Sequence, residues 1–145
     1  MNLQIGQDRP KVGVGLLLIK DDSLVLFGKR KNAHGDGEYA GIGGHMEGLE
    51  TFAETIMREL REEVGDEIQI TEPKFLCLSN IRKYAPKHYI DIGMIAHWVS
   101  GDPKVMEPDK IESWEWYPLD TAPSPLFESP ANYLQAYKAG QTFFE

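Results

Sequence analysis

A single mixed α/β domain is the fold class that this sequence predicts, and three observations support it. The chain has 145 residues, 41% apolar and 26% charged, which is the composition of one globular domain of ordinary size. Apolar runs of strand length recur along it, separated by Pro- and Gly-containing connections. Between them lies one segment, residues 51–65, whose apolar side chains recur at helical spacing. No repeat or linker divides the chain, so we expect one domain over residues 1–145.

The first elements expected are two strands and a loop. Lys11–Lys20 and Ser23–Gly28 are rich in β-branched residues and leucine, and Asp21-Asp22 between them favours a turn. Asn32–Tyr39 is rich in glycine and polar residues, which is typical of a loop.

The strongest helix signal follows. Thr51 and Glu54 have the spacing of a capping box, and Gly65 is a typical helix stop. One apolar face is formed by residues at helical spacing, namely Ala53, Ile56, Met57, Leu60 and Val64. Three further strands are expected at Glu72–Ile81, Tyr89–Val99 and Glu112–Tyr117. Asn132–Ala139 is expected as a short closing helix that ends at Gly140.

Composition also excludes several function classes. The 23 acids and 15 bases give a net charge of −8, which argues against nucleic acid as a partner. Apolar runs such as Val14–Ile19 are far too short to cross a membrane, and Met1–Pro10 has no apolar signal-peptide core. The one cysteine, Cys77, excludes an internal disulfide framework and a cysteine-rich zinc site. We therefore expect no membrane partner and a cytoplasmic location.

Acidic residues crowd into one stretch around the helix. Eight acids lie there, at Glu47, Glu50, Glu54, Glu59, Glu62, Glu63, Asp66 and Glu67. Only Arg58 and Arg61 oppose them, and like charges at helical spacing repel each other. A solvated polar face is the simplest interpretation of such a helix. A bound divalent cation would remove the repulsion, and an all-oxygen site of this kind suits Mg²⁺ or Mn²⁺.

A glycine-rich segment precedes this helix. Gly41-Ile42-Gly43-Gly44 permits close backbone approach, so we expect a turn whose amides, with the helix dipole, bind phosphate oxygens.

Gly44–Asp66 resembles the Nudix box, G-x5-E-x7-R-E-U-x-E-E-x-G-U, where U is aliphatic. All seven fixed positions match, namely Gly44, Glu50, Arg58, Glu59, Glu62, Glu63 and Gly65, and Leu60 matches the first aliphatic position. Asp66 stands where the pattern has an aliphatic residue, and we expect Ile68 to supply that packing contact. Gly43 stands where many members have proline, which suggests a more flexible turn.

The resemblance extends over roughly residues 10–135. Its further motifs are Gly28-Lys29-Arg30-Lys31, Gly43-Gly44-His45, His88-Tyr89, Glu107-Pro108-Asp109-Lys110 and Glu112-Ser113-Trp114-Glu115-Trp116. They are similar to a MutT-type subgroup that includes the human thiopurine-nucleotide-hydrolysing Nudix enzyme and its plant relatives. The resemblance implies a Nudix α/β/α sandwich with a mixed β-sheet and a catalytic loop-helix-loop, and a homodimer.

The family pattern also implies a metal site and catalytic residues. It makes Glu59, Glu63 and the Gly44 carbonyl metal ligands, and Glu62 a ligand or the holder of a metal-bound water. Glu62 or Glu63 would act as general base, although an acid of a later loop, Glu107 or Glu112, stays an alternative. Glu50 and Arg58 would form an ion pair that aims the catalytic helix, or an ordinary surface pair.

Substrate-binding residues are implied with less detail. Arg30 and His45 resemble phosphate contacts of the subgroup, and Lys29 is a further candidate; the plain alternatives are a solvated strand end and a turn histidine. Phe127 and Glu128 are candidates by position for contact with the base. Relatives have Trp-Gly where Glu128 and Ser129 stand, so the base preference does not transfer. A carboxylate at Glu128 would favour a purine, since it can accept hydrogen bonds from guanine.

The sequence therefore predicts an enzyme that hydrolyses a nucleoside tri- or diphosphate, purine or oxidised nucleotides included, with Mg²⁺ or Mn²⁺. Its partner would be a small nucleotide substrate. The alternatives are a hydrolase of an isoprenoid diphosphate or nucleotide sugar, and a non-catalytic nucleotide sensor. The sensor is the weaker alternative because none of the box acids is lost.

Overall fold

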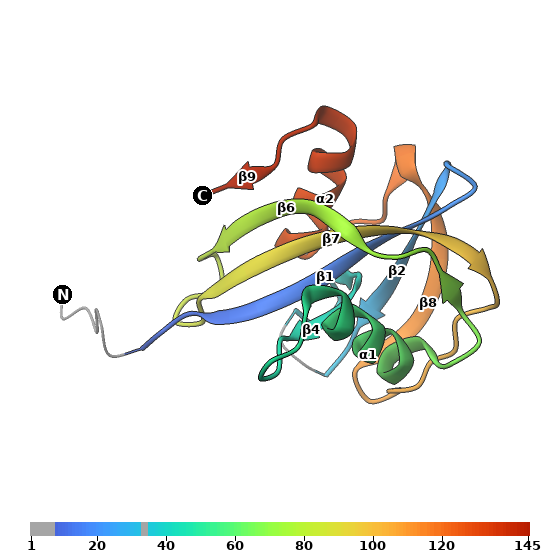
Figure 1. The fold of residues 1–145 in the computed structure, drawn as a ribbon, viewed down its shortest axis with the longest axis horizontal. Helices are drawn as coiled ribbons and strands as arrows, with labels where there is room; N and C mark the ends of the chain where they lie inside the picture. The colour runs from blue at the N-terminus through green and yellow to red at the C-terminus, as the bar shows by residue number, and fades with distance from the viewer. Residues whose placement is uncertain (1–7, 33–34) are drawn as a thin grey trace.

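Two parallel strands, β1 (Lys11–Lys20) and β7 (Tyr89–Ser100), form the centre of the computed structural model, which describes residues 8–32 and 35–145. Their register runs from Lys11 opposite Tyr89 to Ile19 opposite His97. The other strands extend a nine-stranded mixed sheet, whose main path is β3-β2-β1-β7-β6-β9, with β4 paired to β1, β5 to β7 and β8 to β2 (Figure 1).

The remaining elements alternate with short connections. The other strands are β2 (Leu24–Arg30), β3 (Tyr39–Ala40), β4 (Ile42–His45), β5 (Gln69–Ile70), β6 (Lys74–Ile81), β8 (Ile111–Pro118) and β9 (Phe143–Phe144). The helices are α1 (Phe52–Val64), the 3₁₀ turn η1 (Leu119–Thr121) and α2 (Glu128–Ala139). No helix in the described ranges, 8–32 and 35–145, is both long and apolar enough to cross a membrane.

Strand β1 explains why the sheet has two covered faces. Successive side chains of a strand point to opposite faces, and seven consecutive residues of the ten in β1 are buried. Leu16 and Leu18 pack in the core layer that α1 covers, whereas Leu17 and Ile19 pack in the layer that α2 covers. Figure 1 shows the two helices on opposite sides of the sheet. The expected mixed α/β sandwich is therefore confirmed.

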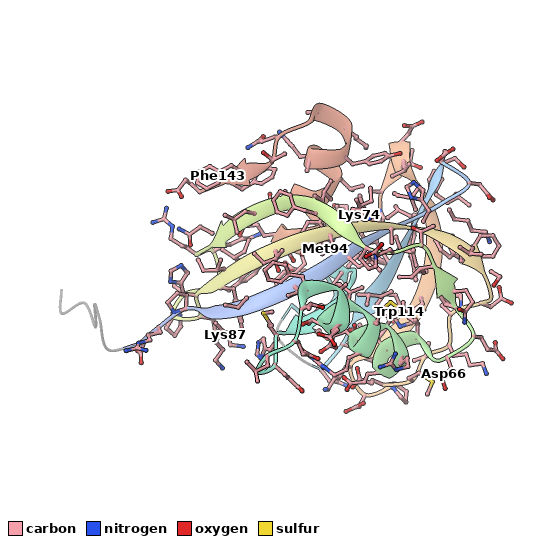
Figure 2. The ribbon with its side chains drawn as sticks, viewed as in Figure 1. Asp66, Lys74, Lys87, Met94, Trp114 and Phe143 are labelled. Carbon is pink, nitrogen blue, oxygen red and sulfur yellow. The ribbon has the colours of Figure 1, made fainter. Side chains whose placement is uncertain are left out.

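Helix α1 begins and ends at the expected residues. The Thr51 hydroxyl accepts the Glu54 amide at 3.1 Å, and the Glu54 carboxylate accepts the Thr51 amide at 2.8 Å. Gly65 ends the helix with a positive φ of 91°, which side chains with a Cβ rarely adopt. Ile68 is buried in the α1 core layer, while Asp66 at the helix end is exposed (Figure 2). Ile68 thus supplies the packing contact that Asp66 does not.

Two expectations were wrong in detail. The glycine segment is no turn, because Gly43 and Gly44 lie in β4 and pair with Gly15 and Val14 of β1. Helix α2 starts at Glu128, four residues before the expected start at Asn132. Pro130 is tolerated in its first turn, where no amide donor is needed, and the Tyr84 hydroxyl accepts the Glu128 amide at 2.9 Å. That cap comes from a distant segment, which local sequence does not reveal.

Candidate functional site

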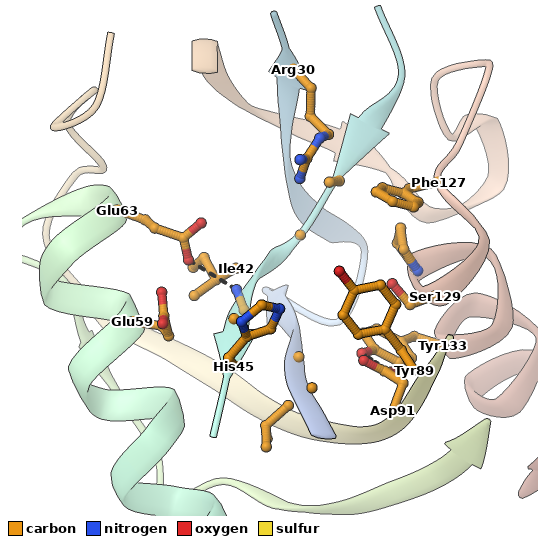
Figure 3. Close-up of a pocket in the computed structure, with 18 of the residues that line it drawn as sticks. Arg30, Ile42, His45, Glu59, Glu63, Tyr89, Asp91, Phe127, Ser129 and Tyr133 are labelled. Atoms are coloured by element: carbon orange, nitrogen blue, oxygen red, sulfur yellow. Dashed lines mark hydrogen bonds between the residues drawn. The ribbon is translucent and has the colours of Figure 1, made fainter. Parts of the chain in front are cut away.

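A cavity of about 440 Å³ opens between the two helices and the N-terminal half of β1. Its size is typical of small-ligand sites. One wall is acidic and comes from α1, as Figure 3 shows for Glu59 and Glu63. The opposite wall comes from β7 and the start of α2 and includes Phe127, Ser129 and Tyr133.

An arginine clamp holds the acidic wall in place. Arg58 donates to both carboxylate oxygens of Glu50, from Nε at 2.8 Å and from Nη2 at 3.1 Å. Glu50 also accepts the Glu47 amide at 2.8 Å and the Thr55 hydroxyl at 2.9 Å. These bonds, that to Arg58 first, lower the pKa of the Glu50 carboxyl to about 2. The geometry is that of a bidentate, networked pair, which differs from an ordinary surface ion pair.

The same guanidinium also ties α1 to β4. Its Nη2 donates to the His45 carbonyl at 2.9 Å, and its Nη1 donates to Glu59 Oε1 at 2.8 Å. Glu62 lies at the edge of the network, with Oε2 3.5 Å from Arg58 Nη1. Arg58 therefore fixes the distance between the glycine strand and the acidic helix face, as its expected orienting role requires.

Gly44 is needed because the Glu59 carboxylate occupies the space of a side chain there. A Cβ at Gly44 would lie 2.3 Å from Glu59 Oε1 and 2.8 Å from Oε2. Gly43 has a similar constraint from the backbone, since its Cβ would lie 2.7 Å from the Val14 carbonyl oxygen. Two glycines in β4 thus allow the strand to pass directly beneath the carboxylates of α1.

Burial affects the Glu63 carboxyl strongly. Its Oε2 accepts the Gly43 amide at 2.9 Å. Burial raises the pKa of the Glu63 carboxyl well above its usual range, and the nearby Glu59 and Glu107 carboxylates act in the same direction. Burial likewise raises the pKa of Glu59, although Arg58 opposes it. Ionisation of these carboxyl groups is therefore unfavourable without a counter-ion, and a bound cation would favour their charged form.

The donor set suits a hard divalent cation. Glu59, Glu62 and Glu63 line one cavity next to Gly44, and all offer oxygen. In the part of the chain that the structure describes, however, no three Asp, Glu, His or Cys side chains already converge on a common metal position. Glu63 is turned to the Gly43 amide and Glu59 to Arg58. Binding a metal ion would require these carboxylates to rotate. The chemistry of the residues therefore fits the ion, whereas their present geometry does not.

In this structure the glycine amides do not form the open phosphate cradle that the sequence suggests. The Gly43 amide is occupied by Glu63, and the first turn of α1 is closed by its own capping box. Arg30 and Lys110 are the basic side chains that line the cavity within the described residues, besides His45. Burial lowers the pKa of the Arg30 guanidinium, while the carboxylates of Glu63 and Glu38 act in the opposite direction. The guanidinium carbon lies 5.0 Å from the centre of the Phe127 ring.

Other expected substrate contacts divide into two groups. His45 lines the cavity and stacks on Tyr89, with 5.6 Å between ring centres. Phe127 lines it as well. Lys29 and Glu128 are not among the lining residues, and the Lys29 ammonium lies 3.7 Å from the Glu112 carboxylate. Alternation along β2 explains this result for Lys29, because Arg30 next to it points into the cavity.

Sequence reasoning missed most of the wall opposite α1. This wall includes Tyr84, Asp91 and Tyr133. On the acidic side, Glu107 and Lys110 also line the cavity, and the Lys110 ammonium lies 3.5 Å from the Glu107 carboxylate. Asp91 carried a usable signal, because an acid inside the apolar run Tyr89–Val99 needs an explanation.

Comparison with known proteins gives a consistent result. A family model described as "NUDIX domain" matches residues 9–137. The crystal structure of a MutT NUDIX hydrolase from Burkholderia pseudomallei superposes with a TM-score of 0.80 at 32% identity, covering 88% of this chain and 98% of that one. The NUDIX domain of Shewanella oneidensis NrtR, solved with ADP ribose, shares the fold with a TM-score of 0.71 at 21% identity, over 97% of this chain and 95% of that one.

Curated relatives are longer proteins. The NAD-capped RNA hydrolase NudC of Stutzerimonas stutzeri is 29% identical over 120 residues, which are 82% of this chain. The aligned part is 41% of that relative, so this chain corresponds to less than half of its length.

Proposed function

This chain belongs to the Nudix hydrolase family, and on that premise we propose that it hydrolyses a phosphoanhydride bond of a nucleoside tri- or diphosphate, or of a nucleoside diphosphate derivative. One observation carries the proposal. Three box carboxylates, of Glu59, Glu62 and Glu63, line one side of a cavity of about 440 Å³ that Arg30 also enters. Such a cavity can hold a nucleotide with its phosphates at the acidic side.

The cofactor we propose is Mg²⁺, with Mn²⁺ as a substitute. Nudix hydrolases generally use divalent cations, and Glu59, Glu62, Glu63 and the Gly44 carbonyl would hold one here. The ion would neutralise phosphate charge and lower the pKa of a bound water. The chain's own contribution is to place the carboxylates through Arg58 and to bind phosphate oxygens through the fork of Arg30.

The general base is an acid of the same wall. Glu62 and Glu63 are candidates from the helix, and Glu107 joins them because it lines the cavity from the loop before β8. Glu112 is the weaker alternative because it does not line the cavity and pairs with Lys29. A proton from the attacking water would pass to one of these carboxylate oxygens.

Relatives suggest which nucleotides to test first. Their names include NAD-capped RNA hydrolase, and one similar structure holds ADP ribose. Both favour a diphosphate linked to a second group over a simple triphosphate. The net charge of −8 favours a small nucleotide over an RNA chain as substrate, although the NudC names make capped RNA a necessary control. A thiopurine nucleotide, suggested by the motif resemblance, belongs in the same screen.

We further propose that the protein forms a homodimer and acts in the cytoplasm. Family resemblance supports the dimer. The strand aromatics add little, because Trp114 is buried in the core and Trp98 and Trp116 pack against it, with Lys20 over both rings.

The test is a hydrolysis screen with Mg²⁺. Substrates would be nucleoside triphosphates, a thiopurine nucleotide, ADP-ribose, NAD, nucleotide sugars, capped RNA and prenyl diphosphates, with products identified by mass spectrometry. Hydrolysis of at least one nucleotide between two phosphates, lost in Glu63→Gln, is the expected result. If only prenyl diphosphates are cleaved, or Glu63→Gln retains full activity, the proposal is wrong.

A further inference from the structure

A buried acid–phenol pair lies in the wall opposite the box carboxylates. Asp91 of β7 is 9% exposed and Tyr133 of α2 is 2% exposed, and both line the cavity. The Tyr133 hydroxyl donates to Asp91 Oδ2. Figure 3 shows the pair beside Ser129, across the cavity from Glu59 and Glu63.

Two glycines make room for the pair. Gly15 and Gly93 lie opposite each other on the paired strands β1 and β7. A Cβ at Gly15 would lie 2.1 Å from the Tyr133 hydroxyl oxygen, and one at Gly93 would lie 2.7 Å from Tyr133 Cε1. The tyrosine ring therefore lies against bare backbone, which fixes its hydroxyl on Asp91. Three residues, one each from β1, β7 and α2, thus hold the Asp91 carboxylate in one orientation.

Asp91 lacks the partners that normally accompany a buried charge. Among residues 8–32 and 35–145, its carboxylate forms no ion pair, and the one side-chain hydrogen bond that it accepts is that from Tyr133 to Oδ2. Burial raises the pKa of its carboxyl to about 6, and the Tyr133 bond only partly offsets this effect. Protein interiors rarely keep such a group without a function, because an unpaired acid costs stability.

We propose that Asp91, oriented by Tyr133, determines substrate specificity by accepting hydrogen bonds from two neighbouring N–H groups of the ligand, as on the N1–H and 2-amino edge of guanine. This inference rests on the proposed nucleotide hydrolysis and names the residue that distinguishes among nucleotides. It also replaces Glu128, which the sequence suggested for this task and which does not line the cavity.

The chemistry separates the candidate ligands. An ionised carboxylate only accepts hydrogen bonds, so it matches an edge with two adjacent donors. Adenine presents an acceptor at N1 beside its amine, and hypoxanthine has N1–H but lacks the 2-amino group. A prenyl chain offers no donor and would bury Asp91 against hydrocarbon. Guanine therefore makes two bonds to Asp91, hypoxanthine one, and adenine no more than one.

The experiment measures binding of GMP, IMP and AMP by isothermal titration calorimetry with Mg²⁺ at pH 7.5. Wild type should bind GMP at least about tenfold more tightly than IMP or AMP, since a hydrogen bond to a charged group contributes about that factor. Asp91→Asn should lose this preference, because its amide presents a donor to the ligand. Glu128→Gln and the exposed Asp102→Asn make the same chemical change elsewhere and should keep it.

Each other outcome overturns the inference. Equal binding of the three nucleotides by wild type would exclude recognition of ligand N–H groups by Asp91, and this result does not depend on any variant's folding. A preference that survives in Asp91→Asn but vanishes in Glu128→Gln would return the role to Glu128. Hydrolysis measured on the same wild-type preparation separates the two proposals: turnover of nucleotides without base preference leaves the proposed function intact, whereas no turnover refutes that function itself.

Discussion

The contact between Gly44 and Glu59 makes the sharpest prediction about the acidic wall. In Gly44→Ala, the new methyl group would lie 2.3 Å from Glu59 Oε1 and 2.5 Å from Cδ. Ordinary van der Waals contact begins near 3.4 Å, so the carboxylate must move by about 1 Å. The Gly44 backbone needs no positive φ, and the obstacle is a flexible side chain. We therefore expect the fold to survive and the carboxylate alone to be displaced.

A displacement of the Glu59 carboxylate by about 1 Å should lower the rate of hydrolysis strongly. Moving a catalytic or ligating group by about 1 Å can cost about 100-fold in rate. We expect kcat/KM for the best substrate to fall by about that factor in Gly44→Ala, and the Mg²⁺ concentration for half-maximal rate to rise. The assay is steady-state hydrolysis over a Mg²⁺ titration, with thermal unfolding measured in parallel.

Gly48 provides the matched control. It lies in the same loop between β4 and α1, and a Cβ there would meet nothing within 4 Å. Gly48→Ala should therefore keep kcat/KM within about twofold of wild type, a free-energy difference well below 1 kcal/mol. If Gly44→Ala also retains wild-type kcat/KM and Mg²⁺ dependence, Glu59 does not act from the position described, and the argument is refuted.

Four further predictions follow from the same geometry. Glu63→Gln should lower kcat by about 10²–10⁴-fold. It should also raise the melting temperature without metal, because it removes a buried acid whose ionisation the fold opposes. An unchanged kcat would contradict this prediction. Between about pH 4.5 and 2, acidification protonates Glu50 in wild type and breaks its ion pair with Arg58, so the free energy of unfolding falls. Glu50→Gln lacks this titration and should lose less stability over the same range, as measured by urea unfolding. Because burial raises the Asp91 pKa from 3.8 to about 6, the free energy of unfolding of wild type should fall by about 3 kcal/mol as pH rises from about 4 to 6. If Asp91→Asn shows the same dependence of unfolding free energy on pH, this prediction is wrong. Light scattering should give about twice the chain mass of 16.4 kDa, and a 16.4 kDa particle contradicts the dimer.

Local patterns were enough to predict the elements with strong periodicity. Strand β1 has the expected bounds, and α1 starts and ends at the caps that Thr51 and Gly65 indicate. The two-residue strands β5 and β9 escaped prediction because two residues cannot show an alternation. β4 was missed because its glycines resemble a turn, although the partner strand β1 supplies the hydrogen bonds that make it a strand.

The acidic wall was predictable and the opposite wall was not. Glu59, Glu62 and Glu63 share a helix face, so their spacing alone brings them together. Asp91 and Tyr133 are 42 residues apart, and their contact depends on how α2 packs over β7. Lys29 and Arg30 were both expected to contact substrate, although neighbouring residues of a strand point to opposite faces. Only Arg30 of these two lines the cavity, and Lys29 lies near Glu112 instead.

The most direct test of the central claim is whether the α1 carboxylates bind the catalytic metal ion. Mn²⁺ binding can be measured by electron paramagnetic resonance for wild type, Glu63→Gln and Gly48→Ala, each with a non-hydrolysable nucleotide. Wild type and Gly48→Ala should bind Mn²⁺ with equal affinity, and Glu63→Gln should bind it at least about tenfold more weakly. Equal Mn²⁺ affinity in all three proteins would contradict the account.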